Sequence, residues 1–240
     1  MRSFSFEGIT PRLAVELQKR LSGEVSIRPL PLSKIKLVAG ADLSYEITEM
    51  LSGFLIRRNS NTVYAGIVVL SYPDLEIIER RVTRVTVDFP YVPGLLSFRE
   101  SPAILQAWKK LRRKPDVLLV DGHGLAHPRR FGIACHLGLL LDLPTVGCAK
   151  SILVGQFDAG KLKSKRGSSV PLMDGKECVG SVLRTRKAVN PVFVTVGHLS
   201  DLRTARQLVL NCSPRYRIPE PARQAHQLVN AARRGEFSVA

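Results

Sequence analysis

The chain has few cysteines and no long apolar run. Its four cysteines form no C-x-x-C pair and lie far apart, at Cys135, Cys148, Cys178 and Cys212. This spacing argues against a zinc site and favours reduced thiols. No apolar run reaches the about 18 residues of a membrane span, and residues 1–10 lack the apolar core of a signal peptide. We therefore expect a cytoplasmic protein with no membrane segment.

Acidic residues are scarce compared with basic ones. The 240 residues include 20 Asp and Glu against 36 Lys and Arg, which gives a formal net charge of +16. Such an excess suits a polyanionic partner, above all nucleic acid, although a basic surface that only aids solubility has the same composition. The 45% of hydrophobic residues can form a normal core. Without an internal repeat or linker, we predict a single domain over residues 1–240.

The sequence argues against a P-loop protein and against a serine hydrolase, because the motif of the first is incomplete and that of the second is absent. The segment Gly155 to Lys161 matches most of a phosphate-binding P-loop, but Leu162 follows where Ser or Thr would bind Mg²⁺. The next residues show no helical pattern, whereas a phosphate cradle needs a helix N-terminus behind it. The sequence also has no G-x-S-x-G elbow of a serine hydrolase.

The hydrophobic pattern predicts three strands in succession near the start of the chain. They are expected over Lys36 to Tyr45, Thr62 to Tyr72 and Leu75 to Val87, with Phe54 to Ile56 as a backward extension of the second. Short turns between them predict an antiparallel meander. Later strands are expected at Val117 to Val120, Pro144 to Gly147 and Pro191 to Val196.

Helices are predicted between and after these strands, at residues 10–22, 130–141, 200–211 and 220–234. Residues 95–114 are also helical in pattern, with a break before a main helix over residues 102–111. Ser101 and Pro102 have the pattern of an N-cap followed by a first-turn proline, which places Glu100 just before its helix. Asp174-Gly175 predicts a hairpin turn, and the basic stretch Lys161 to Val170 predicts a mobile loop. The element order fits an α/β fold with one mixed sheet and helices on its faces.

Asp121 ends the apolar run Val117 to Val120 and is followed by glycines. A carboxylate at the carboxyl end of a buried strand stands where open α/β sheets bind ligands, although Asp-Gly also caps ordinary turns. If this strand returns beside the first one, Asp42 and Asp121 become neighbours. Two such carboxylates repel unless a cation lies between them, and oxygen ligands favour a hard divalent ion. Glu100 is the third candidate acid, and the sequence leaves open whether the three converge.

Three other features accompany these acids. Lys150 follows a predicted strand end at the same sheet edge. It is either a group that orients a phosphate or an attacking water, or a solvated surface lysine. The spacing of His123, His127 and His136 suits no standard zinc site. The stiff aromatic segment Phe89 to Pro93 is either a loop pinned to the core or a wedge that opens a duplex.

Four stretches of the sequence closely resemble endonuclease V. They are Gly40 to Glu46 (GADLSYE), Pro90 to Glu100 (PYVPGLLSFRE), Val120 to Ser151 and Arg217 to His226 (RIPEPARQAH). The likeness extends from about Ile35 to Arg234, and the basic loop from Lys161 to Val170 departs from it.

The resemblance implies a ribonuclease H-like fold and a metal-dependent DNA repair endonuclease. Its substrate would be DNA with deaminated bases, especially deoxyinosine, cut at the second phosphodiester bond on the 3′ side of the lesion to leave 3′-hydroxyl and 5′-phosphate ends. The expected metal is Mg²⁺, with Mn²⁺ as a substitute, and the expected state is a monomer. Inosine-containing RNA remains an alternative substrate, and a non-catalytic lesion-binding protein remains an alternative function.

The resemblance also assigns site residues by motif. Asp42, Glu100 and Asp121 match the metal-binding acids, Lys150 matches a lysine beside the scissile phosphate, and His226 matches a histidine near the metal. The strand-separating wedge corresponds to Pro90, Tyr91, Val92 and Pro93. The pocket for the flipped base corresponds to Gly94, Leu95, Gly122, His127 and Gly132.

Overall fold

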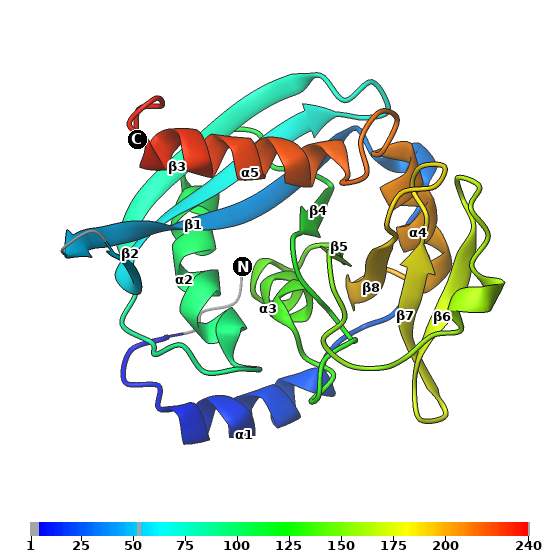
Figure 1. Ribbon diagram of the computed structural model, residues 1–240, viewed down its shortest axis with the longest axis horizontal. Helices are drawn as coiled ribbons and strands as arrows, with labels where there is room; N and C mark the ends of the chain where they lie inside the picture. Colours follow the sequence, from blue (N-terminus) through cyan, green and yellow to red (C-terminus); the bar gives the residue numbers. More distant parts are fainter. Residues whose placement is uncertain (1–4, 52–53, 240) are drawn as a thin grey trace.

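The computed structural model describes residues 5–51 and 54–239, which build an eight-stranded sheet (Figure 1). The strand order is β3-β2-β1-β4-β5-β8-β7-β6. The strands are β1 (Leu37–Leu51), β2 (Phe54–Ser71), β3 (Ile77–Thr86), β4 (Val117–Val120), β5 (Thr145–Ala149), β6 (Ser169–Asp174), β7 (Glu177–Leu183) and β8 (Val192–His198).

The pairing confirms the predicted meander and the return of the fourth strand to the first. β1 pairs with β2 and β2 with β3, both antiparallel, whereas β4 lies parallel to β1 and to β5. Ala41 is the register partner of Val120, and Val120 is the partner of Gly147. The residues that follow these three positions therefore emerge at one edge of the sheet.

Helices cover both faces of the sheet, as predicted. On one face α4 (Leu202–Asn211) and α5 (Glu220–Arg233) pack on strand residues such as Val68 and Leu119. On the other face α2 (Leu96–Lys109) and α3 (Ile133–Leu141) pack on the alternate residues, such as Ile67 and Leu118. Figure 1 shows α5 lying across β1 and β2. In the two described segments, no helix is long and apolar enough to cross a membrane.

The N-terminal helix α1 (Pro11–Ser22) lies outside these layers. Thr10 caps it, because its Oγ1 accepts a hydrogen bond from the Leu13 amide at 3.3 Å. Leu21 packs with Phe131 and Leu139 below α3. Two short 3₁₀ helices, Leu32–Lys34 and Ala159–Lys161, complete the regular elements of the described residues.

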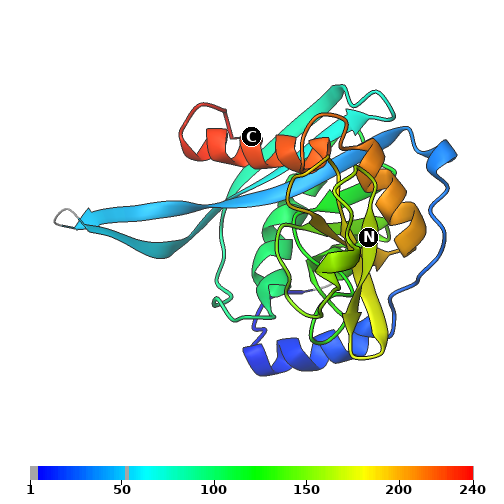
Figure 2. The ribbon, with the colours of Figure 1, turned by 45° about the vertical axis from the view of Figure 1, so that its right-hand side comes forward.

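The first hairpin is longer than the sequence pattern predicts. β1 continues past Tyr45 to Leu51, and β2 begins at Phe54, which confirms the backward extension of the second strand. Register shifts follow Tyr45 and Thr48, so the two strands accommodate irregularities and remain paired. Figure 2 shows the outer part of this pair as a two-stranded ribbon that projects from the body of the molecule.

Two predicted helix starts are wrong. The helix α2 begins at Leu96 and contains Pro102 in its interior, so Ser101 is not its N-cap. Burial of Phe98, Ala103 and Ile104 holds the helix together across the backbone hydrogen bond that the proline removes. As a consequence, Glu100 stands inside a helix and not on the loop before it.

The helix α3 begins at Ile133 and not at Arg130, because Arg130 has a left-handed φ of 53°. The predicted mobile loop is also more ordered than expected. It contains the start of β6, and the Gly167 amide donates to the Arg184 carbonyl at 2.8 Å. The hairpin turn at Asp174-Gly175 joins β6 and β7 as predicted.

Helix α5 reaches its position over β1 because Gly40 has no side chain. A Cβ atom at Gly40 would stand 2.1 Å from the Pro221 carbonyl oxygen. Real Cβ atoms do not approach backbone oxygen so closely, and backbone cannot move aside as a flexible side chain can. The glycine therefore sets the distance between the sheet and the helix that carries His226.

Substituting Gly40→Ala tests this contact. We expect a loss of about 1–3 kcal/mol in the free energy of unfolding, because overpacking forces the first turn of α5 away from β1. Urea denaturation measures the loss. The control is Gly23→Ala, where a Cβ would lie 3.6 Å from the Arg20 carbonyl, an ordinary contact. Equal stability of the two variants would contradict the close-approach argument.

Candidate active site

Two aspartates stand side by side where the parallel pairing of β1 with β4 ends. Asp42 lies in β1 directly after Ala41, and Asp121 directly follows β4, whose last residue Val120 pairs with Ala41. Neighbouring strands lie about 4.8 Å apart. Both side chains are mostly buried, with 14% of Asp42 and 18% of Asp121 exposed. The local sequence thus places two carboxylates next to each other on rigid backbone.

Glu100 reaches the same edge from helix α2. The Tyr45 hydroxyl on β1 donates a hydrogen bond to Glu100 Oε1 at 3.3 Å, which links the helix to the strand that carries Asp42. Burial, the charge of Asp42 and the charge of Asp121 raise the pKa of Glu100 to about 8. The three candidate acids are therefore close enough to influence one another electrostatically.

Two basic side chains pair with the aspartates. Lys150, just after β5, donates to Asp121 Oδ2, and His226 Nδ1 on α5 lies 2.8 Å from Asp42 Oδ2. Burial and the charge of Asp42 raise the pKa of Asp121 despite the lysine. The hydrogen bond to Asp42 raises the pKa of His226. Each predicted catalytic side chain therefore lies at this edge of the sheet.

His226 is held by two residues that the sequence did not single out. Asn230 Nδ2 donates to the His226 carbonyl at 2.8 Å and lies 3.1 Å from His226 Nε2. Ser44 Oγ donates to Asn230 Oδ1 at 3.1 Å. The Asn230 amide nitrogen is a donor, since it faces the His226 carbonyl. His226 Nε2 therefore accepts from Asn230, and the proton of the neutral ring stands on Nδ1, toward Asp42. The one sequence signal for this contact is the spacing of four residues between His226 and Asn230 on a helix.

The acids have the right chemistry for a hard divalent cation but are not arranged as a closed ligand set. Among residues 5–51 and 54–239, no three His, Cys, Asp or Glu side chains are grouped tightly enough to hold a metal ion. The Asp42 and Asp121 carboxylates are turned toward His226 and Lys150 instead. Oxygen donors in three mutually repelling carboxylates suit Mg²⁺.

A cavity of about 460 Å³ opens beside the acids. Most of the predicted wedge and pocket residues line it, together with Glu100, Asp121 and Lys150. They are Tyr91, Val92, Pro93, Gly94, Gly122, His127 and Gly132. Residues that sequence reasoning missed complete the lining: Leu96, Ser97, His123, Ile133, Ala149, Ser151, Ile152 and Leu153. Leu95 does not line the cavity, because it is buried against Ala14 and Phe98, and Leu96 occupies the expected place.

The wedge segment is fixed at its base and exposed at its tip. Tyr91 has 63% of its surface exposed. Gly94, with a left-handed φ of 77°, ends the segment, and its carbonyl is 3.0 Å from Gln18 Nε2 and 2.7 Å from Arg129 Nη2. The Phe89 ring lies 5.9 Å from the Phe98 ring. The segment is therefore pinned to the core at its ends while its aromatic tip projects, and its action as a wedge stays a prediction.

The histidines near the cavity are not arranged as metal ligands. Burial and the neighbouring Arg129 lower the pKa of His127 to about 4, and its Nε2 lies 3.0 Å from the Gly94 carbonyl. His123 Nε2 lies 3.0 Å from the Ser151 carbonyl. His136 is buried against the rings of Phe98 and Phe131, and burial lowers its pKa to about 3. Each of the three histidine side chains thus has its own surroundings in the described structure.

Comparison with known proteins places this geometry in a family. The family model described as "Endonuclease V" matches residues 19–227. The endonuclease V of Myxococcus xanthus is 50% identical over 232 residues, which cover 97% of this chain and 93% of that protein. The chain belongs to the endonuclease V family. It is therefore an endonuclease, a phosphodiester hydrolase that acts on nucleic acid.

Solved structures agree with the family and the fold. The endonuclease V of Streptomyces avermitilis superposes with a TM-score of 0.86 at 39% identity and covers 95% of each chain. The endonuclease V of Ciona intestinalis, solved in complex with a 23mer DNA containing an inosine followed by a ribo-adenosine, has a TM-score of 0.78 at 28% identity, over 95% of this chain and 100% of that one. The fold is ribonuclease H-like, as expected.

The raised pKa of Glu100 makes stability depend on pH. Its folded-state pKa of about 8 exceeds the ordinary 4.5, so the unfolded chain releases a proton that the folded chain keeps. Without metal, the free energy of unfolding should fall as pH rises from 4.5 to about 8. Glu100→Gln should remove this loss, so that above pH 8 its free energy of unfolding exceeds that of the wild type by a few kcal/mol. Urea denaturation in chelator measures the difference.

The control for this comparison is Glu16→Gln on the exposed surface of α1, where the ion pair with Arg12 is 3.4 Å long and solvated. It should follow the wild-type pH profile. Parallel profiles for wild type and Glu100→Gln would show that Glu100 ionises normally in the folded chain.

Proposed function

We propose that this protein is a Mg²⁺-dependent DNA repair endonuclease that cleaves DNA beside deaminated bases, above all deoxyinosine. The observation that supports this most is the adjacency of two sites. The acidic edge formed by Asp42, Glu100 and Asp121 directly borders the cavity beneath Tyr91, and two of the three acids line that cavity. A single DNA strand can therefore place a base in the cavity and a nearby phosphodiester at the acids.

Asp42, Glu100 and Asp121 are the residues that would hold the metal. When bound, Mg²⁺ lowers the pKa of a water molecule and neutralises charge on the phosphate. Lys150 leaves Asp121 to contact the phosphate, since its side chain is 43% exposed at the cavity rim. His226, oriented by Asn230, keeps Asp42 in place. Mn²⁺ has the same preference for carboxylate oxygens and is the expected substitute.

The cavity is proposed as the pocket for the flipped base. Gly94, Gly122 and Gly132 bring backbone to its wall, and Leu96, Ile133 and Leu153 add apolar surface. Extrusion of a base costs a few kcal/mol, and least for a mismatched or damaged base. Hypoxanthine opposite thymine is such a base. Tyr91 and the flanking prolines would occupy the space that the base leaves in the stack.

The position of the cut follows from the family resemblance. We propose cleavage at the second phosphodiester bond on the 3′ side of the lesion, with 3′-hydroxyl and 5′-phosphate products. A sequencing-gel assay with end-labelled duplex identifies the bond.

Inosine-containing RNA is the second candidate substrate. The Ciona intestinalis relative was solved with a ribonucleotide immediately after the inosine. Duplexes that differ only by one 2′-hydroxyl at that position compare the two substrates directly. A faster cut next to the ribonucleotide would favour the endoribonuclease.

Asp121→Asn tests the nuclease function. The amide keeps the size of the carboxylate but loses its charge. Replacing a residue that only supports a metal ligand costs up to about a hundredfold in activity, so loss of a ligand should slow single-turnover nicking of a deoxyinosine duplex in Mg²⁺ by more than that. The control is Asp142→Asn, at an exposed helix end where φ is 51° and Asn is equally suited. If the wild-type protein bound the deoxyinosine duplex in Mg²⁺ and did not nick it, the result would favour the non-catalytic lesion-binding alternative.

Tyr91→Ala tests the wedge. The alanine variant loses the ring that would stack on a DNA base. Such a contact contributes about 1–3 kcal/mol, so binding to a deoxyinosine duplex should weaken by about tenfold. Calorimetric titration with Mg²⁺ should give the wild-type result, because Tyr91 does not contact the acids. Tyr91→Phe, which keeps the ring, is the matched control. Loss of metal binding in the alanine variant would rule out a separate wedge.

A further inference from the structure

A strongly basic surface lies next to the active site and is not used by the chemistry above. Its exposed side chains come from the loop before β6, the loop after β7 and the segment before α5. They are Lys163, Lys165, Arg166, Arg186, Lys187 and Arg215, and are called the basic ridge below. The three segments contribute no acidic residue, since Asp and Glu are absent from residues 159–173, 178–200 and 202–219.

The ridge is a built surface and not a set of unrelated side chains. The loop before β6 is tied to the loop after β7 by backbone hydrogen bonds: Arg184 N to Ser168 O at 2.9 Å and Ala188 N to Ser164 O at 2.9 Å. Arg166 Nη2 donates to the Leu210 carbonyl at 2.7 Å, which fastens the same loop to α4. The backbone that carries these positive charges is therefore tied into one structure before any partner arrives.

Arg217 joins the ridge to the catalytic edge. Its Nη2 donates to the Lys150 carbonyl at 3.1 Å and to the Pro191 carbonyl at 2.8 Å, and its Nε donates to the Asn190 carbonyl at 2.9 Å. In return, Thr185 Oγ1 donates to the Arg217 carbonyl at 2.7 Å. Arg217 therefore links the loop after β7 directly to the lysine that pairs with Asp121.

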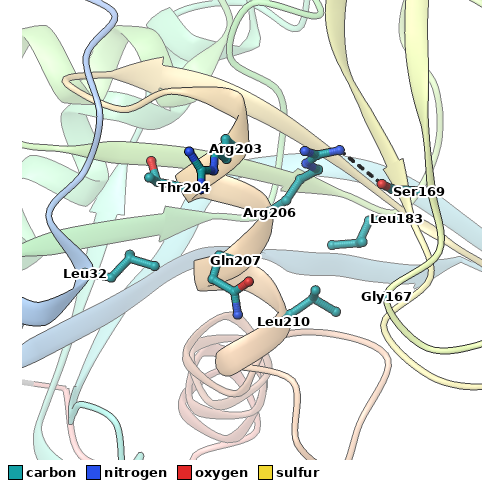
Figure 3. A pocket seen from close by; sticks show the side chains of 9 residues that line it. All are labelled: Leu32, Gly167, Ser169, Leu183, Arg203, Thr204, Arg206, Gln207 and Leu210. Atoms are coloured by element: carbon teal, nitrogen blue, oxygen red, sulfur yellow. Dashed lines mark hydrogen bonds between the residues drawn. The ribbon is translucent and has the colours of Figure 1, made fainter.

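The basic character continues past the ridge loop onto helix α4. A second cavity of about 470 Å³ lies between them, bordered by Gly167 of the loop and by Arg203 and Arg206 of the helix (Figure 3). Figure 3 shows Arg206 reaching across to Ser169, with Nη1 at 3.1 Å from Oγ. Positive charge therefore follows a path from Lys150 over the ridge to α4.

The ridge charges are not neutralised within the protein. In the part of the chain that the structure describes, Lys163, Lys165, Arg186 and Lys187 form no ion pair with a carboxylate, whereas nearby Lys161 lies 3.3 Å from Asp158. Clustered cations that repel one another lower stability unless something offsets the repulsion. A polyanion with regularly spaced charges is the natural counterpart.

We propose that the basic ridge binds the phosphate backbone of the duplex that flanks the cleaved bond, and so extends the footprint beyond the damaged nucleotide. This rests on the proposed function in that the partner is a nucleic acid. The ridge consists of lysine and arginine side chains, and contacts of such side chains with phosphates carry no sequence information, so we expect its contribution to be independent of sequence. Each phosphate contact releases counterions and steepens the salt dependence of binding.

The test is a variant with Lys163→Ala, Lys165→Ala, Arg186→Ala and Lys187→Ala. Fluorescence anisotropy, without divalent metal, gives its affinity for duplexes of about three helical turns, ~30 base pairs, with and without one deoxyinosine. The slope of log K against log salt should become shallower by about 0.9 for each phosphate that the variant no longer neutralises. The decrease in affinity should be equal for both duplexes, and single-turnover nicking at saturating DNA should stay at the wild-type rate.

The matched control removes four exposed charges elsewhere: Arg80→Ala, Lys109→Ala, Arg112→Ala and Arg113→Ala, on β3 and around the end of α2. It should keep the wild-type slope. An unchanged slope in the ridge variant, or the same change in both variants, would overturn the proposal. Failure of the wild type to prefer or nick deoxyinosine would instead refute the proposed function, since the undamaged duplex tests the ridge alone.

Discussion

The arrangement of the active site depends on one repulsion. Parallel pairing of β1 with β4 places Asp42 and Asp121 on adjacent strands, and Glu100 approaches from the other layer. Carboxylates so close together destabilise the folded chain unless cations balance them. Lys150 and His226 supply part of that balance, each paired with one aspartate. The rest of the fold keeps these groups together against their mutual repulsion.

Packing supplies that restraint from both faces of the sheet. On one side, α5 lies directly on the backbone of β1 because Gly40 is bare, and it carries His226 and Asn230 to the edge. On the other side, α2 holds Glu100 in a buried helix whose contacts continue through Pro102. The polar network of Ser44, Asn230 and His226 has each partner defined, so the ring orientation is set before substrate binds.

Much of this could be predicted from local pattern. The alternation of the first three strands predicts the meander, and the apolar run before Asp121 predicts β4. The sequence leaves open whether β4 returns beside β1, which is the condition for Asp42 and Asp121 to be neighbours. The remainder depends on tertiary packing. Whether Leu95 or Leu96 faces the cavity depends on where α2 begins, and burial of Phe98 and Ile104 overrides the break that Pro102 suggests. The spacing of Asn230 from His226 predicts their contact along the helix, but the contact of His226 with Asp42 and of Asn230 with Ser44 depends on how α5 is rotated over β1. The length of the β1-β2 ribbon exceeds what alternation alone indicates.

The three donors on the Gly94 carbonyl have a consequence for damage search. Gln18 from α1, and His127 and Arg129 from the loop before α3, all point at this oxygen, so the base of the projecting loop is braced by two parts of the chain that are remote in sequence. If the segment acts as the proposed wedge, this bracing would leave its tip little freedom to yield against an intact, well-stacked helix. The tip would then enter only where stacking is already weak. Discrimination between sound and altered bases would then begin with the mechanical resistance of the double helix, ahead of any inspection of the base itself.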